Sequence, residues 1–231
     1  MPATRTLRTA ATRDAILAAA ERLFAEQGLS AVSHRQIAEA AGQRNVTAVS
    51  YHFGSRTDLV QAIMTRHGEQ VDEIRRRYAS QAAAVDGLTG WVRALVVPVT
   101  DHLASLGVPS WNARFSVQVM TDPVMRALVT DEALTRPHLG RILDGLGRHL
   151  GHLPRQVRAA RGDMARHVIT HTCAERERAL ARSAGLLHSS WDETADALTD
   201  ALGGLLSAPV SRPTEPPTAF GKEHQEHEDP R

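Results

Sequence analysis

The segment from Thr12 to Leu59 constrains the fold of this chain more than any other stretch. Apolar residues recur at helical spacing from Ile16 to Phe24, and Gly28 follows them as a stop, which predicts one amphipathic helix. Two capping boxes and two more glycines then follow before the segment ends. Short capped helices separated by tight glycine turns predict a helix-turn-helix module.

The two short helices of this module have local start and stop signals. Ser33 and Gln36 form a capping box that predicts the start of the first helix. Gly42 ends that helix, because glycine accepts the positive φ of a sharp turn. Asn45 is a favoured N-cap residue for the second helix, which Gly54 ends.

The rest of the chain is also predicted to be helical. Ser55 and Asp58 form the capping box of a long helix that continues to about Tyr78. Apolar stripes at 3.6-residue spacing predict further helices over about 91–103, 111–119, 139–150, 154–183 and 190–206. Ala, Leu, Arg and Glu are frequent and aromatic residues make up only 4%, so we expect an all-α protein.

Charge and proline are unevenly distributed along the chain. Residues 1–67 carry eight arginines and five acidic residues, whereas the whole chain has a net charge of only +1. Residues 1–9 are predicted to be a loose basic arm, and a basic amino-terminal part suits a polyanionic partner. Five of the eleven prolines lie in 207–231, so this segment is predicted to be a disordered tail.

The single cysteine, Cys173, excludes an intrachain disulfide and fits a reducing, cytoplasmic compartment. No segment approaches the roughly 20 apolar residues that a membrane span needs, so no membrane partner is expected. Cofactor motifs such as a Walker loop or a Rossmann glycine run are also missing, and we expect no cofactor and no enzymatic activity.

A helix-turn-helix module predicts which side chains meet DNA. The first short helix crosses the sugar–phosphate backbone and the second presents polar groups to base edges. Arg44 suits guanine, and Gln43 or Asn45 suits adenine, whereas Val46 and Phe53 are expected to pack inward. The complete predicted DNA-binding set is Ser33, His34, Arg35, Gln43, Arg44, Asn45, Thr47, Ala48, Ser50, Tyr51, His52 and Arg56.

Three runs of this segment carry a resemblance to a known family. They are the run from Tyr51 to Arg56 with Leu59 after it, the run from Glu21 to Gly28, and the run from Ile37 to Gly42. Residues 10–70 thereby resemble the helix-turn-helix domain of the TetR (tetracycline repressor) family of bacterial regulators. The resemblance implies a second, helical ligand-binding and dimerisation domain over 71–206.

Several positions depart from the usual pattern of that family. Eleven steps separate Gly42 from Phe53, where ten are commonest, so the chain resembles a subgroup with one extra residue before the recognition helix. Ala48 stands where threonine is common and Ser50 where an aromatic residue is common, while Arg56 replaces lysine and keeps its charge. The insertion affects the base-contacting residues more than the phosphate-contacting residues, and no operator sequence is inferred.

The last predicted helices form a candidate dimer interface. Apolar residues of the final helix repeat at spacings of four and three, which suits packing against another helix. The resemblance implies that this helix and the one before it pair with their copies, so that a homodimer reads a palindromic operator. The predicted interface residues are Val157, Met164, Val168, His171, Trp191, Ala195, Leu198, Leu202 and Leu205. The alternative is that this seam packs inside the same chain.

The resemblance also implies that an unidentified small molecule releases the DNA from a repressor. An apolar cavity with a few polar groups is predicted around Trp91, His102, Trp111, Phe115, Met120 and Met125. Each of these side chains has a second interpretation as ordinary core. Arg114, next to this set, is predicted to lie at the surface, although it is also a candidate for meeting an acidic ligand.

Other functions fit parts of the sequence. One alternative keeps the same fold but makes the protein an activator, or a regulator that binds no ligand, instead of a ligand-released repressor. A helical enzyme or metal sensor would use His167, His171 and Cys173, because two histidines four residues apart share one helix face. The pattern does not assure a third ligand, however, and the general base of a zinc protease is absent because Val168 follows His167. Nonspecific DNA packaging is disfavoured by the low net charge.

Overall fold

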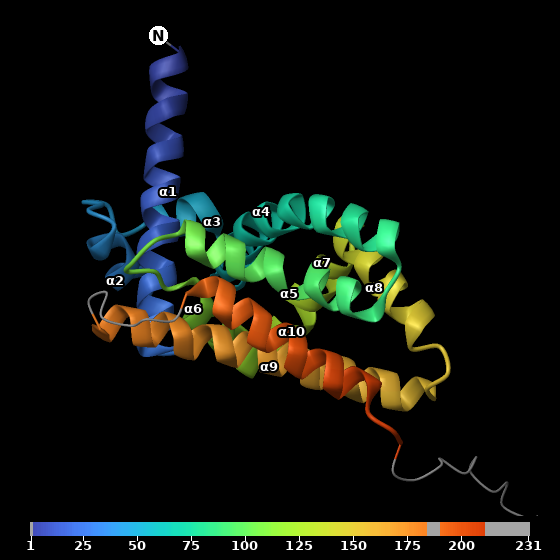
Figure 1. The fold of residues 1–231 in the computed structure, drawn as a ribbon. Helices are drawn as coiled ribbons and strands as arrows, with labels where there is room; N and C mark the ends of the chain where they lie inside the picture. Colours follow the sequence, from blue (N-terminus) through green and yellow to red (C-terminus); the bar gives the residue numbers. More distant parts are fainter. Residues whose placement is uncertain (1, 184–189, 211–231) are drawn as a thin grey trace, which may run out of the picture.

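The computed structural model describes residues 2–183 and 190–210, and within these ranges all regular structure is helical (Figure 1). The ten helices are α1 (Pro2–Gln27), α2 (His34–Ala40), α3 (Ala48–Phe53), α4 (Arg56–Val85), α5 (Leu88–Ser105), α6 (Asn112–Thr121), α7 (Pro123–Leu134), α8 (Pro137–His149), α9 (Arg155–Ser183) and α10 (Trp191–Ser207). The all-α prediction is confirmed. None of these described helices has the length and apolar character that a membrane span requires.

The local signals of the amino-terminal segment act as predicted. The hydroxyls of Ser33 and Ser55 accept hydrogen bonds from the N3 amides of α2 and α4, and both capping boxes are complete. Gly42 and Gly54 have φ of 67° and 74°, in the left-handed region that favours glycine. The chain therefore turns sharply after α2 and again after α3.

The core of the amino-terminal bundle also holds part of α6. Ile16 and Phe24 of α1 pack with Ile37 of α2 and Leu59 of α4 in one buried cluster. Phe115 of α6 joins this cluster, and its ring lies 6.1 Å from that of Phe24 in a stacked arrangement. Helix α6 therefore anchors the amino-terminal bundle to the remaining helices.

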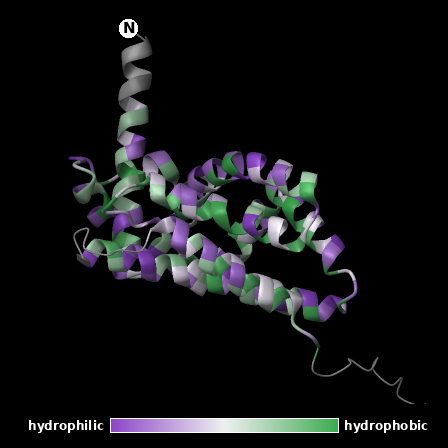
Figure 2. Ribbon diagram, viewed as in Figure 1, coloured by the Kyte–Doolittle hydropathy of each residue, from purple (hydrophilic) through white to green (hydrophobic). Residues whose placement is uncertain are grey.

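A second core surrounds α5, which packs against α4 on one side and α10 on the other. Figure 2 shows hydrophobic residues concentrated on α5, next to the more hydrophilic α4. Trp91 is buried here, and its indole N–H donates to Asp86 Oδ1 at 3.2 Å. The guanidinium of Arg148 covers the Trp91 ring at 5.4 Å.

Gly145 on α8 lies directly against the Trp91 ring, where an added Cβ would come within 2.3 Å of ring atoms. Gly145→Ala should therefore lower the free energy of unfolding by about 1–3 kcal/mol through overpacking. Gly147→Ala is the matched control, since no atom lies within 4 Å of its Cβ position. Urea denaturation of both variants checks this, and equal stability of the two would contradict it.

Two predicted helix starts need correction. Helix α1 begins at Pro2 rather than Thr12, so the backbone predicted to be a loose arm is helical. Helix α3 begins after Thr47 rather than after Asn45. Asn45 Oδ1 accepts from the backbone N–H of Thr47 at 3.0 Å and from its hydroxyl at 2.7 Å, which closes a local turn instead of capping the helix.

Helix α7 lies between the helices predicted over 111–119 and 139–150, where the sequence predicted none. Pro123 occupies the first turn, where its missing N–H costs nothing, and Asp122 accepts from the amides of Val124 and Met125. Helix α4 continues beyond Tyr78 to Val85 and crosses the predicted domain boundary between residues 70 and 71. Of the predicted tail, residues 211–231 lie outside the described part of the chain.

Candidate DNA-binding face and effector cavity

The amino-terminal bundle presents an exposed polar face formed by α2, α3 and the turn between them. Tyr51 is 82% exposed, and its ring stacks edge-on against His52 at 5.1 Å. Arg44, Asn45 and Thr47 are exposed in the turn before α3. The structure therefore places most of the predicted base-contacting and phosphate-contacting side chains on one surface.

Several side chains that were predicted to contact DNA form hydrogen bonds or ion pairs with other residues of this face. His34 Nδ1 lies 3.0 Å from Ser50 Oγ, which ties α2 to α3. Gln43 donates from its amide to the Ala41 carbonyl at 3.0 Å, so it stabilises the turn. Arg35 pairs with Glu39 at 2.8 Å, but both side chains are exposed, and such a pair is easily exchanged for a phosphate.

Val46 was predicted to pack inward, and this prediction is wrong: its side chain is 47% exposed. The helical spacing behind the prediction does not apply there, because the chain is not helical between Gly42 and Thr47. Helix α3 is only six residues long, so Gln43 and Arg44 lie in the loop before it rather than on it.

Arg56 was predicted to be a phosphate contact, but its Nη2 donates to the carbonyl of Val32 at 2.9 Å and the side chain is half-buried. It holds the start of α4 against the loop before α2. Arg13, which sequence reasoning missed, donates from Nη1 to the His52 carbonyl at 3.0 Å and covers the Phe53 ring at 4.2 Å. No local pattern marks a contact between residues 39 apart.

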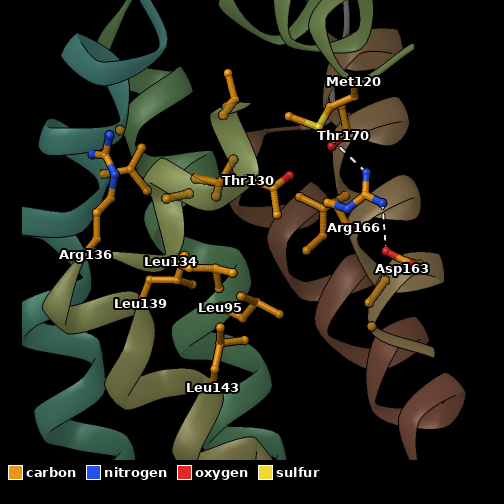
Figure 3. A pocket seen from close by; sticks show the side chains of 18 of the residues that line it. Leu95, Met120, Thr130, Leu134, Arg136, Leu139, Leu143, Asp163, Arg166 and Thr170 are labelled. Atoms are coloured by element: carbon orange, nitrogen blue, oxygen red, sulfur yellow. Dashed lines mark hydrogen bonds and ion pairs between the residues drawn. The ribbon is translucent and has the colours of Figure 1, made fainter. Parts of the chain in front are cut away.

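A cavity of about 790 Å³ lies between helices α4 to α9 (Figure 3). This volume is within the range of small-molecule sites. Leucines such as Leu95, Leu139 and Leu143 form apolar walls, and several arginines lie among them. The cavity is therefore large enough for a small organic molecule.

Of the residues predicted to line a pocket, Met120 lines this cavity and the other five do not. Trp91 and Phe115 are buried in the two cores described above, and Met125 packs against the amino-terminal core. Trp111 donates to Glu26 Oε1 at 3.2 Å, and His102 bonds to another histidine. Trp91 and Phe115 therefore follow the alternative interpretation as core.

A chain of hydrogen bonds runs from this cavity into the amino-terminal bundle. His67, which lines the cavity, lies with Nδ1 2.8 Å from His102 Nε2 and with Nε2 3.0 Å from Glu21 Oε2. The three side chains come from α4, α5 and α1 respectively. Burial, followed by the neighbouring His67, lowers the pKa of His102 to about 4, so its ring is neutral at pH 7.

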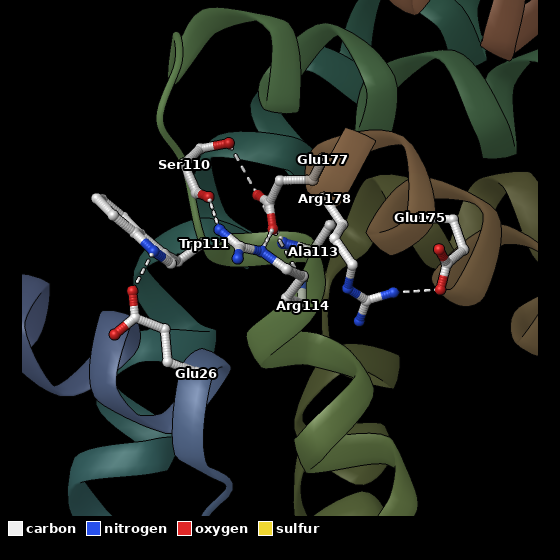
Figure 4. A network of polar contacts seen from close by, with 8 residues as sticks. All are labelled: Glu26, Ser110, Trp111, Ala113, Arg114, Glu175, Glu177 and Arg178. Carbon is white, nitrogen blue, oxygen red and sulfur yellow. Dashed lines mark hydrogen bonds and ion pairs between the residues drawn. The ribbon is translucent and has the colours of Figure 1, made fainter. Parts of the chain in front are cut away.

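A buried carboxylate fixes the start of α6 (Figure 4). Glu177 of α9 is 2% exposed and accepts from the hydroxyl of Ser110, the amides of Ala113 and Arg114, and Arg114 Nε. Arg114 also donates to the Ser110 carbonyl at 2.6 Å. The predictions of a surface or ligand role for Arg114 are therefore wrong, because it is an internal ion-pair partner.

The predicted dimer seam on α10 closes within the same chain. Ala195, Leu198 and Leu202 are buried in the core around α5, and Trp191 and Leu205 pack partly buried against it. This is the alternative that the sequence left open. On α9, by contrast, Met164 and Val168 are exposed apolar side chains.

The three residues of the metal-sensor or enzyme hypothesis, His167, His171 and Cys173, do not form one site on α9. His167 and His171 are exposed, with ring centroids 6.5 Å apart, whereas Cys173 is 2% exposed. Burial raises the pKa of the Cys173 thiol to about 12, which makes it a poor nucleophile. Within the described part of the chain, no three metal-binding side chains come together.

With this geometry in place, comparison with known proteins decides the family of the amino-terminal bundle. Residues 16–63 match the family described as bacterial regulatory proteins, tetR family. Residues 16–63 are therefore similar to the DNA-binding domain of the TetR family. This is a family of DNA-binding transcriptional regulators rather than of enzymes.

The TetR-type domain also has a curated relative. Over 92 residues the chain is 36% identical to the HTH-type transcriptional regulator TtgR of Pseudomonas putida. This match covers 40% of the present chain and 42% of TtgR, so the chain spans less than half the length of the relative.

Two solved TetR-family structures align with most of the chain. One is the regulator PfmR from Thermus thermophilus, with a TM-score of 0.49 and 18% identity over 82% of this chain and 94% of that one. The other is a regulator from Mesorhizobium loti, with a TM-score of 0.47 and 17% identity over 86% of this chain and 96% of that one. Likenesses at this level carry no weight for function.

Proposed function

We propose that this protein is a homodimeric repressor that binds a palindromic operator and releases it when a small molecule fills the cavity between α4 and α9. The observation that carries the proposal is the exposed face around Tyr51 within a TetR-family domain. The cavity and its physical links to that domain support the ligand-released mode.

DNA binding would use α3 and the turn before it in the major groove. Arg44 and Asn45 lie in the exposed turn, where their side chains can reach base edges. Tyr51 and His52 would meet the phosphates that flank the groove, and Arg35 would exchange Glu39 for a phosphate. Arg13 and Arg56 would act indirectly, by fixing the helices that carry these groups.

Dimerisation would place two such faces on one duplex. The exposed apolar side chains of Met164 and Val168, with His171 nearby, give α9 a surface that a second copy can cover. A two-fold dimer requires recognition helices about 34 Å apart or a multiple of that, so that both half-sites face the same side of the DNA.

Release of DNA would depend on α6, which contacts both the cavity and the DNA-binding domain. Asn112, Ser116 and Met120 of this helix line the cavity, while Phe115 stacks on Phe24 of α1. A ligand that prefers a conformer with α6 displaced would therefore also displace α1. The ligand can lower the affinity for DNA by no more than the factor by which its own affinity differs between the two conformers.

Selection of bound duplexes from a random pool, with the full-length protein, tests the proposal. Enriched sequences should contain two inverted half-sites whose centres are about 10 base pairs apart or a multiple of that. Deletion of the gene should raise expression from a promoter that carries the selected site. Failure to enrich any sequence would refute operator binding, and lower expression would indicate an activator.

Two variants of the exposed face should affect binding differently. Arg44→Ala should change which sequence is preferred, because a bidentate base contact contributes about 1–3 kcal/mol of discrimination. Tyr51→Phe should weaken binding to all sequences alike by about 1 kcal/mol, since it removes one hydroxyl contact to phosphate. Gel-shift affinities for the selected site and for scrambled duplexes measure both effects.

Arg76→Ala is the control for these two variants. Arg76 pairs with Glu73 on the exposed surface of α4, twenty residues beyond the start of that helix. A helix rises about 1.5 Å per residue, so Arg76 lies about 30 Å from Arg56. Unchanged DNA binding in all three variants would refute the placement of the DNA-binding face.

A further inference from the structure

The charges that line the cavity are unevenly balanced. Five arginines lie along its walls: Arg75, Arg136, Arg155, Arg158 and Arg166. Only two carboxylates, those of Glu132 and Asp163, accompany them there. In Figure 3, Arg136 and Arg166 lie on opposite sides of the cavity, with the side chains of Leu134 and Leu95 between them. Apolar side chains thus separate Arg136 from Arg166 within the cavity.

Arg136 is the most deeply placed of these cations. It is 8% exposed, and its Nη2 donates to both oxygens of Glu132, at 2.6 and 2.9 Å. The same atom lies 3.5 Å from the Thr65 carbonyl. Its other terminal nitrogen, Nη1, is buried and has no hydrogen-bond partner in the described part of the chain. An unpaired buried donor of this kind is costly, so an acceptor is expected to meet it.

The backbone of α4 makes room for this guanidinium. At Gly68 an added Cβ would lie 2.4 Å from three atoms of the Arg136 side chain. Every larger residue at position 68 would push the guanidinium away from α4. The glycine therefore fixes where the charged group of Arg136 sits within the cavity wall.

A second buried arginine lies close to the first. Arg75 is 3.8 Å from Asp72, whose carboxylate also accepts from the amides of His138 and Leu139. Its Nε is buried and has no hydrogen-bond partner among the described residues. Burial lowers the pKa of Arg75 to about 10, and the charge of Arg136 contributes, yet Arg75 remains protonated at neutral pH.

From these observations we infer that the cavity binds an amphiphilic organic anion, with a carboxylate or phosphate head at Arg136 and Arg75 and an apolar body along the leucines. The inference rests on the proposed function and names the chemical class of its effector. The unpaired polar atoms of the lining residues, Arg75 Nε, Arg136 Nη1 and Arg158 Nε, are all donors. Such donors select an acceptor, and an ionised acceptor binds a guanidinium about twice as strongly as a neutral one.

Three probes with the same ten-carbon chain distinguish the contribution of the head group to binding from that of the apolar body. Decanoate, decyl phosphate and decanol are each titrated into the full-length protein by calorimetry, without DNA. We expect at least one of the two anions to bind ten or more times more tightly than decanol. The anion that binds more tightly tells whether the natural head group is a carboxylate or a phosphate.

The double variant Glu132→Gln with Arg136→Gln tests the position of the head group. It removes both members of the ion pair, so neither charge is left buried alone. We expect it to bind the anions and decanol with similar affinity. Arg166→Gln is the matched control, because its guanidinium pairs with the exposed Asp163 on the other side of the cavity. It should keep most of the preference for an anion.

Four outcomes would overturn the inference: decanol binding as tightly as the anions, binding of none of the probes, an unchanged preference in the double variant, or equal losses in the double variant and Arg166→Gln. The proposed function is judged separately, by gel shift on the selected operator. Operator binding that persists without any anion binding would reject the effector class alone. Tight anion binding by a protein that selects no operator would reject the proposed repressor function alone.

Discussion

Replacement of Glu177 with alanine is expected to lower the free energy of unfolding by about 3–5 kcal/mol, the usual result of breaking a buried ion pair by removing one partner. The loss would leave the guanidinium of Arg114 without its counter-ion and the amides of Ala113 and Arg114 without their acceptor. Urea denaturation of the full-length protein measures the change.

Glu175→Ala is the control for this variant, on the same helix and two residues earlier. Glu175 is 68% exposed and pairs with Arg178 at the surface, so its removal should change stability by less than about 1 kcal/mol. A loss at Glu177 no larger than the loss at Glu175 would show that the network does not hold α6 in place. Because α6 also packs on α1, operator affinity should fall in the Glu177 variant alone.

Acid should weaken the fold through His102. Its pKa is 6.5 in an unstructured chain and about 4 in the folded protein, so the unfolded state binds a proton that the folded state does not. Stability from this group is therefore complete above pH 6.5 and is lost as the pH falls towards 4. The lowered pKa corresponds to about 3 kcal/mol at the acid end of that range.

The measurement compares wild type with His102→Gln, whose side chain does not titrate. Free energies of unfolding are determined at pH 7 and pH 4.5 for both proteins. Carboxylates away from His102 affect both proteins equally, so the difference between their pH dependences reports on His102 together with the His67 and Glu21 side chains linked to it. We expect wild type to lose about 2–3 kcal/mol more than the variant. Parallel pH dependences would contradict this assignment.

Signals that act between near neighbours in the sequence were the ones that could be predicted. The capping boxes at Ser33 and Ser55 and the turns at Gly42 and Gly54 depend on contacts within a few residues. The helix-turn-helix order follows from them. Helix α7 could have been found in the same way, since an acidic residue before a proline marks a helix start as readily as a break.

Features that depend on distant contacts were not predictable. The cavity takes its arginines from α4, from α9 and from the residue that precedes α8, and in the sequence each of them looks like an ordinary surface charge. Trp91 and Phe115, which were predicted to line it, fill the cores instead, because large apolar rings gain most from complete burial.

The apolar seam of α10 shows the same limitation. Its spacing predicts a helix partner but does not say which one. In the structure the partner is α5, a helix whose apolar residues need cover on more than one side. Ala195, Leu198 and Leu202 supply that cover, and the periodic pattern is the same as it would be at a contact between two chains.

Helix α4 joins the DNA-binding face to the cavity as one uninterrupted rod. Arg56 clamps its first turn to the loop before α2, and Gly68 lies twelve residues further along, against the cavity wall. At about 1.5 Å per residue the two points are about 18 Å apart, so a tilt of about 10° about Gly68 carries the first turn sideways by about 3 Å. In a two-fold dimer the first turn of α4 in the other protomer would move by the same amount. The separation of the two first turns would then change by up to about 6 Å, roughly the rise of two base pairs.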